Sequence, residues 1–122
     1  MKRARFRALV EEALAELPQE FRERLDNVAI MIEDRPSAEE MASVGAEDRY
    51  ELLGLYLGVP QTERDSGYHM VLPDRIVLYQ KNIEDVCESD EEVRQEVKLT
   101  VAHEIAHHFG ISDEELDRLG LG

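Results

Sequence analysis

The residues with the clearest capacity for chemistry lie between His103 and Asp113, in the run HEIAHHFGISD. Successive residues of a helix turn by about 100°, so His103 and His107 would lie about 40° apart and one turn displaced. Two imidazoles at this spacing can bind one metal ion from the same helix face. Glu104 lies beside that face, where it can hold a water on the metal and accept its proton. The pattern therefore predicts a zinc hydrolase site with two histidine ligands and Glu104 as general base.

The third metal ligand is predicted to be Asp113. Gly110 can adopt a positive φ and turn the chain back toward the helix that it has just left. Asp113, three residues further on, would then reach the metal and leave the fourth position open to water. Two alternatives stay open. Asp113 also suits the first turn of a following helix, where the helix dipole favours acidic residues, and Glu114 or Glu115 could supply the carboxylate instead.

His108 directly follows the second proposed ligand. On a helix it falls on the apolar side, near Val97 and Val101. We therefore predict a packed histidine with a hydrogen-bonded ring, because buried polar groups need partners, and not a metal ligand.

Two further features are interpreted as structural. The polar loop 61–69 carries Tyr68 and His69, either of which could stabilise an oxyanion, but a solvated turn is the favoured interpretation.

Cys87 has the acidic neighbours Glu84, Asp85 and Glu88. Acidic surroundings raise the pKa of a thiol, which argues against a nucleophile.

Regular elements must position these residues. The spacing of apolar residues, the turn residues and the capping boxes predict both helices and strands. A continuous apolar run at 28–32 indicates a buried strand. The expected order is a helix over Phe6–Leu17, a short helix after Pro18, a strand at 28–32, a helix from Ser37 to about Gly45, a strand within 52–59, a strand at 75–81, a long helix from Ser89 to about Phe109, and a last short helix capped by Ser112.

This order predicts the α+β class: a small mixed sheet of three or four strands with helices packed on it. The 122 residues form one domain by size, spanning 1–122, since no repeat or linker divides them. The chemical motif lies on the long helix of the C-terminal half.

Composition narrows the functional class. The formal net charge is −14, and such a surface repels phosphate backbones and anionic lipid, so neither nucleic acid nor a membrane is an expected partner. The single cysteine excludes an internal disulfide and a CxxC zinc cluster. Neither a signal peptide nor a membrane span is recognisable, so a cytoplasmic location is expected.

The segment from His103 to Asp113 resembles the zincin superfamily of zinc metallopeptidases, and its extension to Asp113 resembles the metzincin arrangement. The whole chain is similar to the small bacterial minimal zincin-like metallopeptidases. The similar stretches are 53–56, 58–60, 72–79 and 103–116. The resemblance implies a zincin-like α+β fold, with His103, His107 and Asp113 as zinc ligands and Glu104 as general base.

Two functions are compatible with these observations. The first is a zinc-dependent peptidase acting on peptides or flexible protein segments, although the ligand set also suits manganese, iron or cobalt. The second is a binding or regulatory module of zincin fold, with a metal site but little turnover. The second is favoured by the absence of a methionine after the motif, where metzincins have a Met-turn, and by the absence of a second subdomain. No oligomeric state is predicted.

Overall fold

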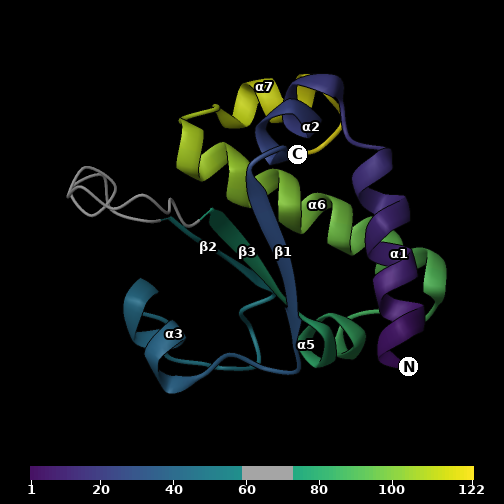
Figure 1. The fold of residues 1–122 in the computed structure, drawn as a ribbon, viewed down its shortest axis with the longest axis vertical. Coiled ribbons are helices and arrows are strands. Elements are labelled where there is room, and N and C mark those ends of the chain that lie inside the picture. Colours follow the sequence, from purple (N-terminus) through teal and green to yellow (C-terminus); the bar gives the residue numbers. More distant parts are fainter. Residues whose placement is uncertain (59–72) are drawn as a thin grey trace.

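The computed structural model describes residues 1–58 and 73–122 (Figure 1). Its helices and strands follow the predicted order, with one additional short helix, α5. The elements are α1 (Arg3–Ala15), α2 (Gln19–Leu25), β1 (Val28–Glu33), α3 (Ala38–Val44), β2 (Gly54–Leu57), β3 (Asp74–Tyr79), α5 (Gln80–Asp85), α6 (Asp90–Phe109) and α7 (Asp113–Arg118). No helix in these described ranges is both long and apolar enough to cross a membrane.

The sheet is mixed and three-stranded in the order β1-β3-β2, which confirms the predicted α+β class. β1 pairs with β3 in parallel, with Ile30 opposite Ile76. β2 pairs with the other side of β3 in the antiparallel sense, with Tyr56 opposite Ile76. The strand predicted at 28–32 is present, but it is less buried than expected: Met31 is 46% exposed and its neighbours are half-buried. β1 lies at an edge of the sheet, and β3 takes the central place.

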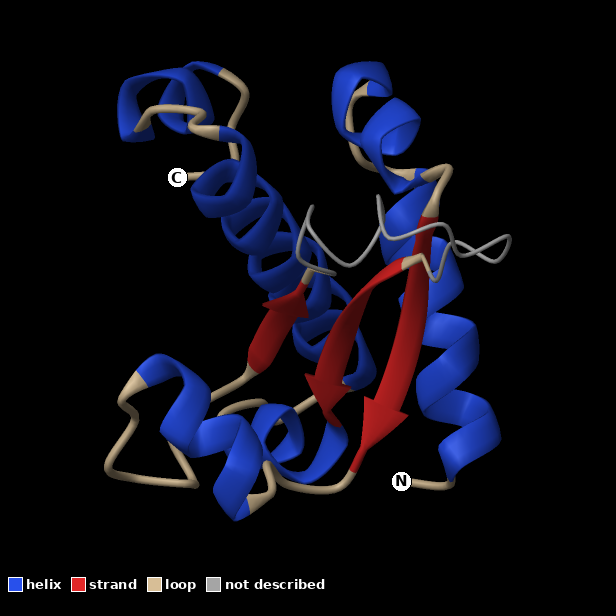
Figure 2. Cartoon of the chain, turned by 60° about the vertical axis from the view of Figure 1, so that its left-hand side comes forward, coloured by secondary structure: helices blue, strands red, loops and turns tan. Residues whose placement is uncertain are grey.

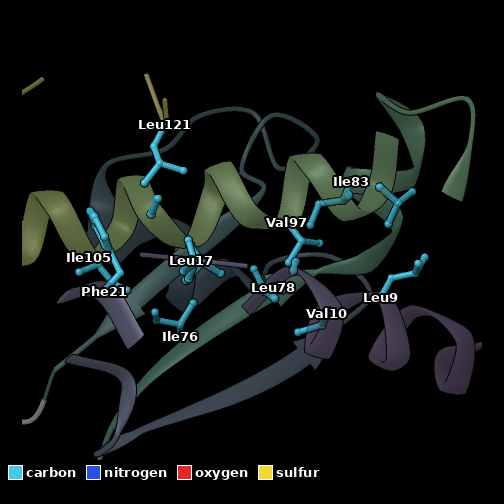
Figure 3. Close-up of a cluster of buried hydrophobic side chains, with 14 of the residues drawn as sticks. Leu9, Val10, Leu17, Phe21, Ile76, Leu78, Ile83, Val97, Ile105 and Leu121 are labelled. Carbon is cyan, nitrogen blue, oxygen red and sulfur yellow. The ribbon is translucent and has the colours of Figure 1, made fainter. Parts of the chain in front are cut away.

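The main core lies between the sheet and the two longest helices. In Figure 2 these helices, α1 and α6, lie behind the strands. The side chains of β3 alternate between the two faces of the sheet. Ile76 and Leu78 join this core, while Val77 and Tyr79 pack with Leu55 on the opposite face. Figure 3 shows the same core edge-on, with α6 running across the picture and the strands below it. The buried members of this core include Phe6, Leu9, Val10, Phe21, Ile83, Val97, Ile105 and Leu121.

Helix ends follow the local signals in the sequence. Ser37 and Glu40 form the full capping box of α3. The sequence pattern of Ser89 and Glu92 also indicates a capping box, but only half of it is present. Ser89 caps α6 by accepting from the Glu92 N–H, whereas the Glu92 carboxylate accepts from the Glu88 N–H. α6 ends at Gly110, whose φ of 72° confirms the predicted left-handed turn.

α5 was not predicted. Because it begins at Gln80, the strand predicted at 75–81 ends two residues earlier, at Tyr79. The helix has no amphipathic pattern, because two of its three buried residues are the polar Gln80 and Asn82. Asn82 is held by tertiary contacts: its amide donates to the carbonyls of Arg49 and Leu52 at 2.6 and 2.7 Å. Such contacts between distant segments leave no periodic signal in the sequence.

Close packing of β2 against α6 depends on Gly54. A Cβ atom at this position would lie 2.7 Å from Thr100 Cγ2 and 3.3 Å from the Val77 carbonyl oxygen. We expect Gly54→Ala to lower the free energy of unfolding by about 1–3 kcal/mol through overpacking, measured by chemical denaturation. Gly58→Ala is the control, since its nearest neighbour is a side-chain atom of exposed His108 at 3.3 Å; an equal loss in both variants would contradict the role given to Gly54.

Candidate metal centre

The long helix α6 carries both histidines of the motif. They lie one turn apart, as its continuous helix from residue 90 to 109 requires. His103 is half-buried, and its Nε2 lies 2.9 Å from the carbonyl oxygen of Leu121. His107 is exposed and lines a hollow beside β2. The two rings therefore lie on the same strip of α6 but in different surroundings, because His103 is covered by the C-terminal turn and His107 is exposed.

Glu104 faces the edge strand β2. Its Oε1 accepts a hydrogen bond of 2.9 Å from the backbone N–H of Tyr56. Burial raises the pKa of the Glu104 carboxyl, and this effect outweighs the lowering by the Tyr56 N–H and by the nearby His107 and His103. The side chain is thus held in one orientation and binds a proton more readily than an exposed glutamate.

The hollow beside β2 has a volume of about 380 Å³. One part of its wall is apolar and the other carries the ionisable groups of α6. Its lining residues are Val44, Leu52, Gly54, Leu55, Tyr56, Glu104, His107 and His108. Glu104 and His107 therefore meet at one cavity that can receive an apolar group.

His108 differs from its prediction. It is 40% exposed in its side chain, and its ring stacks on the Tyr56 ring with 4.0 Å between centroids. Its Nε2 lies 3.9 Å from Asp74 Oδ2, and the Tyr56 hydroxyl donates to the same oxygen at 2.7 Å. The His108 ring borders the hollow and packs on Tyr56 of β2. The sheet therefore covers only part of the helix face that the sequence pattern indicated to be apolar.

Tyr56 and Asp74 are the site residues that sequence reasoning missed. Tyr56 holds Glu104 through its main chain and contacts both Asp74 and His108 through its side chain. Both residues fall in stretches that carried the family resemblance, 53–56 and 72–79, which is the one signal that could have identified them. Tyr68 and His69, considered as oxyanion partners, lie outside the described residues.

The carboxylates after Gly110 lie on α7. Asp113 and Glu114 are exposed in its first turn, where Ser112 caps the helix by accepting from the Glu115 N–H. Glu115 bonds Arg118, which lowers the pKa of its carboxyl. Within residues 1–58 and 73–122, no three His, Cys, Asp or Glu side chains are gathered around one point where a metal ion could bind. The assignment of Asp113 as third ligand therefore stays a prediction.

The donor types on α6 nevertheless fit zinc. Two imidazoles one helical turn apart, next to a half-buried carboxylate, are the nitrogen and oxygen donors that this ion accepts. His103 and His107 are the residues that would hold it.

A model of one protein family matches residues 25–122, and the family is described as zincin-like metallopeptidase. The chain belongs to this family. Among solved structures, the chain is similar to a conserved hypothetical protein from Thermo thermophilus, with 28% sequence identity and a TM-score of 0.56. The similarity covers 86% of this chain and 91% of that chain. No curated protein matches the chain. Zinc binding is a general property that membership of a zincin family implies.

Cys87 lies apart from this centre and is not activated. Burial and the nearby Glu96 and Glu92 raise the pKa of its thiol to about 11. We expect alkylation by iodoacetamide to be slow at neutral pH and to accelerate about tenfold per pH unit until the pH approaches that value, because only the thiolate reacts. Rates measured between pH 7 and 11 check this; a rate that levels off near pH 8.5 would indicate an ordinary thiol.

Proposed function

We propose that this zincin-like protein is a zinc-dependent peptidase that cleaves peptides or flexible protein segments. The observation that supports this most directly is the meeting of Glu104 and His107 at one hollow beside the edge strand β2. A proton acceptor, a metal-binding imidazole and a cavity for a side chain are then adjacent. Metal-dependent hydrolysis of a peptide bond makes use of all three.

In the proposed reaction, His103 and His107 hold the metal and Glu104 is the general base. A bound zinc ion would supply Lewis acidity and lower the pKa of its water toward about 7. Glu104 would accept the proton of the attacking water and pass it to the leaving amine. The Tyr56 N–H, which donates to Glu104 Oε1 at 2.9 Å, would keep the carboxylate in place. The other carboxylate oxygen, Oε2, would accept and release the proton.

The hollow suggests the substrate class. Val44, Leu52, Leu55 and Tyr56 line it beside Glu104, so an apolar residue next to the cleaved bond would be preferred. The net charge of −14 would favour segments that are basic elsewhere. We propose peptides that combine an apolar side chain at the cleaved bond with lysine or arginine further away.

A binding or regulatory module with little turnover is the second candidate. Two observations favour it: His103 Nε2 is engaged by the Leu121 carbonyl, and no third donor is gathered with the histidines among the described residues. Such a module would bind the same peptides without cleaving them.

Metal analysis of the purified protein, combined with a peptide-library cleavage assay, separates the two candidates. The peptidase is expected to contain about one zinc ion per chain and to cleave library peptides, and a chelator should abolish cleavage. A protein that retains peptides but releases no fragments, with or without added zinc, would be a binding module.

Asp113→Asn tests the third ligand. If Asp113 ligates zinc, this variant should weaken zinc affinity by about 100-fold or more, since even the partners of metal ligands contribute 10–100-fold, and thermal stability should hardly change. If Asp113 serves only the dipole of α7, the variant should cost about 0.3–1 kcal/mol of stability. Isothermal titration with zinc and thermal melts measure both quantities. Unchanged affinity would assign the third position to Glu114, Glu115 or another residue.

A further inference from the structure

The carbonyl oxygen of Leu121 lies 2.9 Å from Nε2 of His103. A carbonyl can only accept a hydrogen bond, so this ring nitrogen must carry the proton and act as donor. A nitrogen that donates a hydrogen bond has no free lone pair for a metal ion. The contact therefore involves an atom that the proposed metal site would need.

Nε2 is the ring nitrogen through which His103 and His107 would bind a shared metal ion. It is the ring nitrogen farther from the backbone, while Nδ1 lies close to the helix surface. Rings anchored one turn apart, with Cβ atoms about 5–6 Å from each other, converge on one ion most readily through their outer nitrogens.

The contact is built by the turn that ends α7. Gly120 has a φ of 77°, its N–H donates to the Asp117 carbonyl at 3.0 Å, and the Leu121 N–H donates to the Leu116 carbonyl at 2.8 Å. These two bonds define a Schellman motif, in which the residue after the left-handed glycine packs back on the helix. The Leu121 side chain is 1% exposed and joins the main core.

Figure 3 shows Leu121 reaching α6 from the side opposite Ile76 and Leu78. The segment 120–121 is therefore held on α6 by its own side chain and by its turn, and its carbonyl is directed at His103. The intact turn therefore keeps the Leu121 carbonyl beside His103.

We propose that Gly120 and Leu121 form a latch that competes with the metal ion for His103 Nε2. This proposal rests on the proposed function, because it requires His103 to be a ligand. Metal binding would release the Leu121 carbonyl and loosen the turn after α7, and an intact turn would lower metal affinity by the same factor, since such coupling is reciprocal. The availability of the metal ion would thereby control how firmly residues 120–121 are held on α6.

Two variants weaken the latch without changing a metal-binding side chain. Leu121→Ala removes its buried anchor, and its control is Leu9→Ala, the same change at a leucine that is 2% exposed in α1. Gly120→Ala strains the left-handed turn. Its control is Gly45→Ala, where φ is 67° and, as at Gly120, nothing lies within 4 Å of an added Cβ. We expect both latch variants to bind zinc about 3- to 10-fold more tightly than their controls, the factor that one hydrogen bond of ordinary net strength contributes. Competition with a chromophoric chelator measures these affinities.

Hydrogen exchange tests the coupling in the wild-type chain. Adding zinc should accelerate exchange of the Leu121 N–H. The Ala46 N–H provides an internal control, because it donates to the Met41 carbonyl at 3.0 Å in the equivalent turn after α3. Its exchange should not change.

The outcomes separate the latch from the function on which it rests. If the wild type binds zinc and the latch variants bind it no more tightly than their controls, the latch is wrong and the metal site stands. Weaker binding by these variants would also overturn the latch and make the Leu121 carbonyl a support for the ligand. If no variant and no wild-type protein binds zinc, the metal site itself fails and the latch with it. Binding by a latch variant alone would support the latch.

Discussion

Glu104→Gln is expected to reduce peptide hydrolysis by about 100-fold or more while zinc binding and folding are retained. General-base catalysis by a positioned side chain contributes roughly 10²–10⁴-fold, and an amide cannot accept the proton. Glutamine keeps the shape of the side chain, and its carbonyl oxygen can still accept the Tyr56 N–H that bonds Glu104 at 2.9 Å. Initial rates with a cleaved library peptide, measured at saturating zinc, check this expectation.

The choice of glutamine separates the chemical role of Glu104 from its structural one. Glu104→Ala removes the hydrogen bond from the Tyr56 N–H as well, so it should also lower the free energy of unfolding by roughly 1–3 kcal/mol. Full activity in Glu104→Gln would show that another group takes the proton. Loss of zinc from Glu104→Gln would show that Glu104 is a ligand, which contradicts the division of roles proposed above.

His103→Ala and His107→Ala are each expected to weaken zinc binding by at least about 100-fold. Each removes one of the two imidazoles on the same strip of α6, and removal of a direct ligand should exceed the 10–100-fold effect of mutating a ligand's partner. Isothermal titration or metal content after dialysis measures the loss. Peptide hydrolysis should disappear in both variants at the same zinc concentration.

His108→Ala is the matched control, because it is the same substitution one residue further along the same helix. Its ring stacks on Tyr56 and not on the strip of His103 and His107, so zinc affinity should stay within about twofold of the wild type. His103→Ala also removes the bond to the Leu121 carbonyl, and thermal melts must accompany its titration. Equal zinc loss in His108→Ala and His107→Ala would refute the assignment of ligands.

Much of the fold could be predicted from local patterns. The alternation of β3, the left-handed turn at Gly110 and the helix α6 each follow from a few neighbouring residues, since periodicity and capping act over one or two turns. The place of β1 at the edge of the sheet could not be predicted, because an apolar run looks the same at the edge and in the centre of a sheet. Strand order depends on contacts between segments far apart in the chain, as between β1 and β3.

The sequence by itself determined the chemistry that is available. The spacing of His103, Glu104 and His107 places two imidazoles and a carboxylate on adjoining sides of one helix, because helical geometry alone sets those angles. The tertiary structure decided how each group is engaged. It joins Glu104 to the Tyr56 N–H, puts His107 at an apolar hollow and turns the Leu121 carbonyl toward His103. The two hydrogen bonds link residues 48 and 18 positions apart, and such pairings arise from packing of whole elements, which no local pattern encodes.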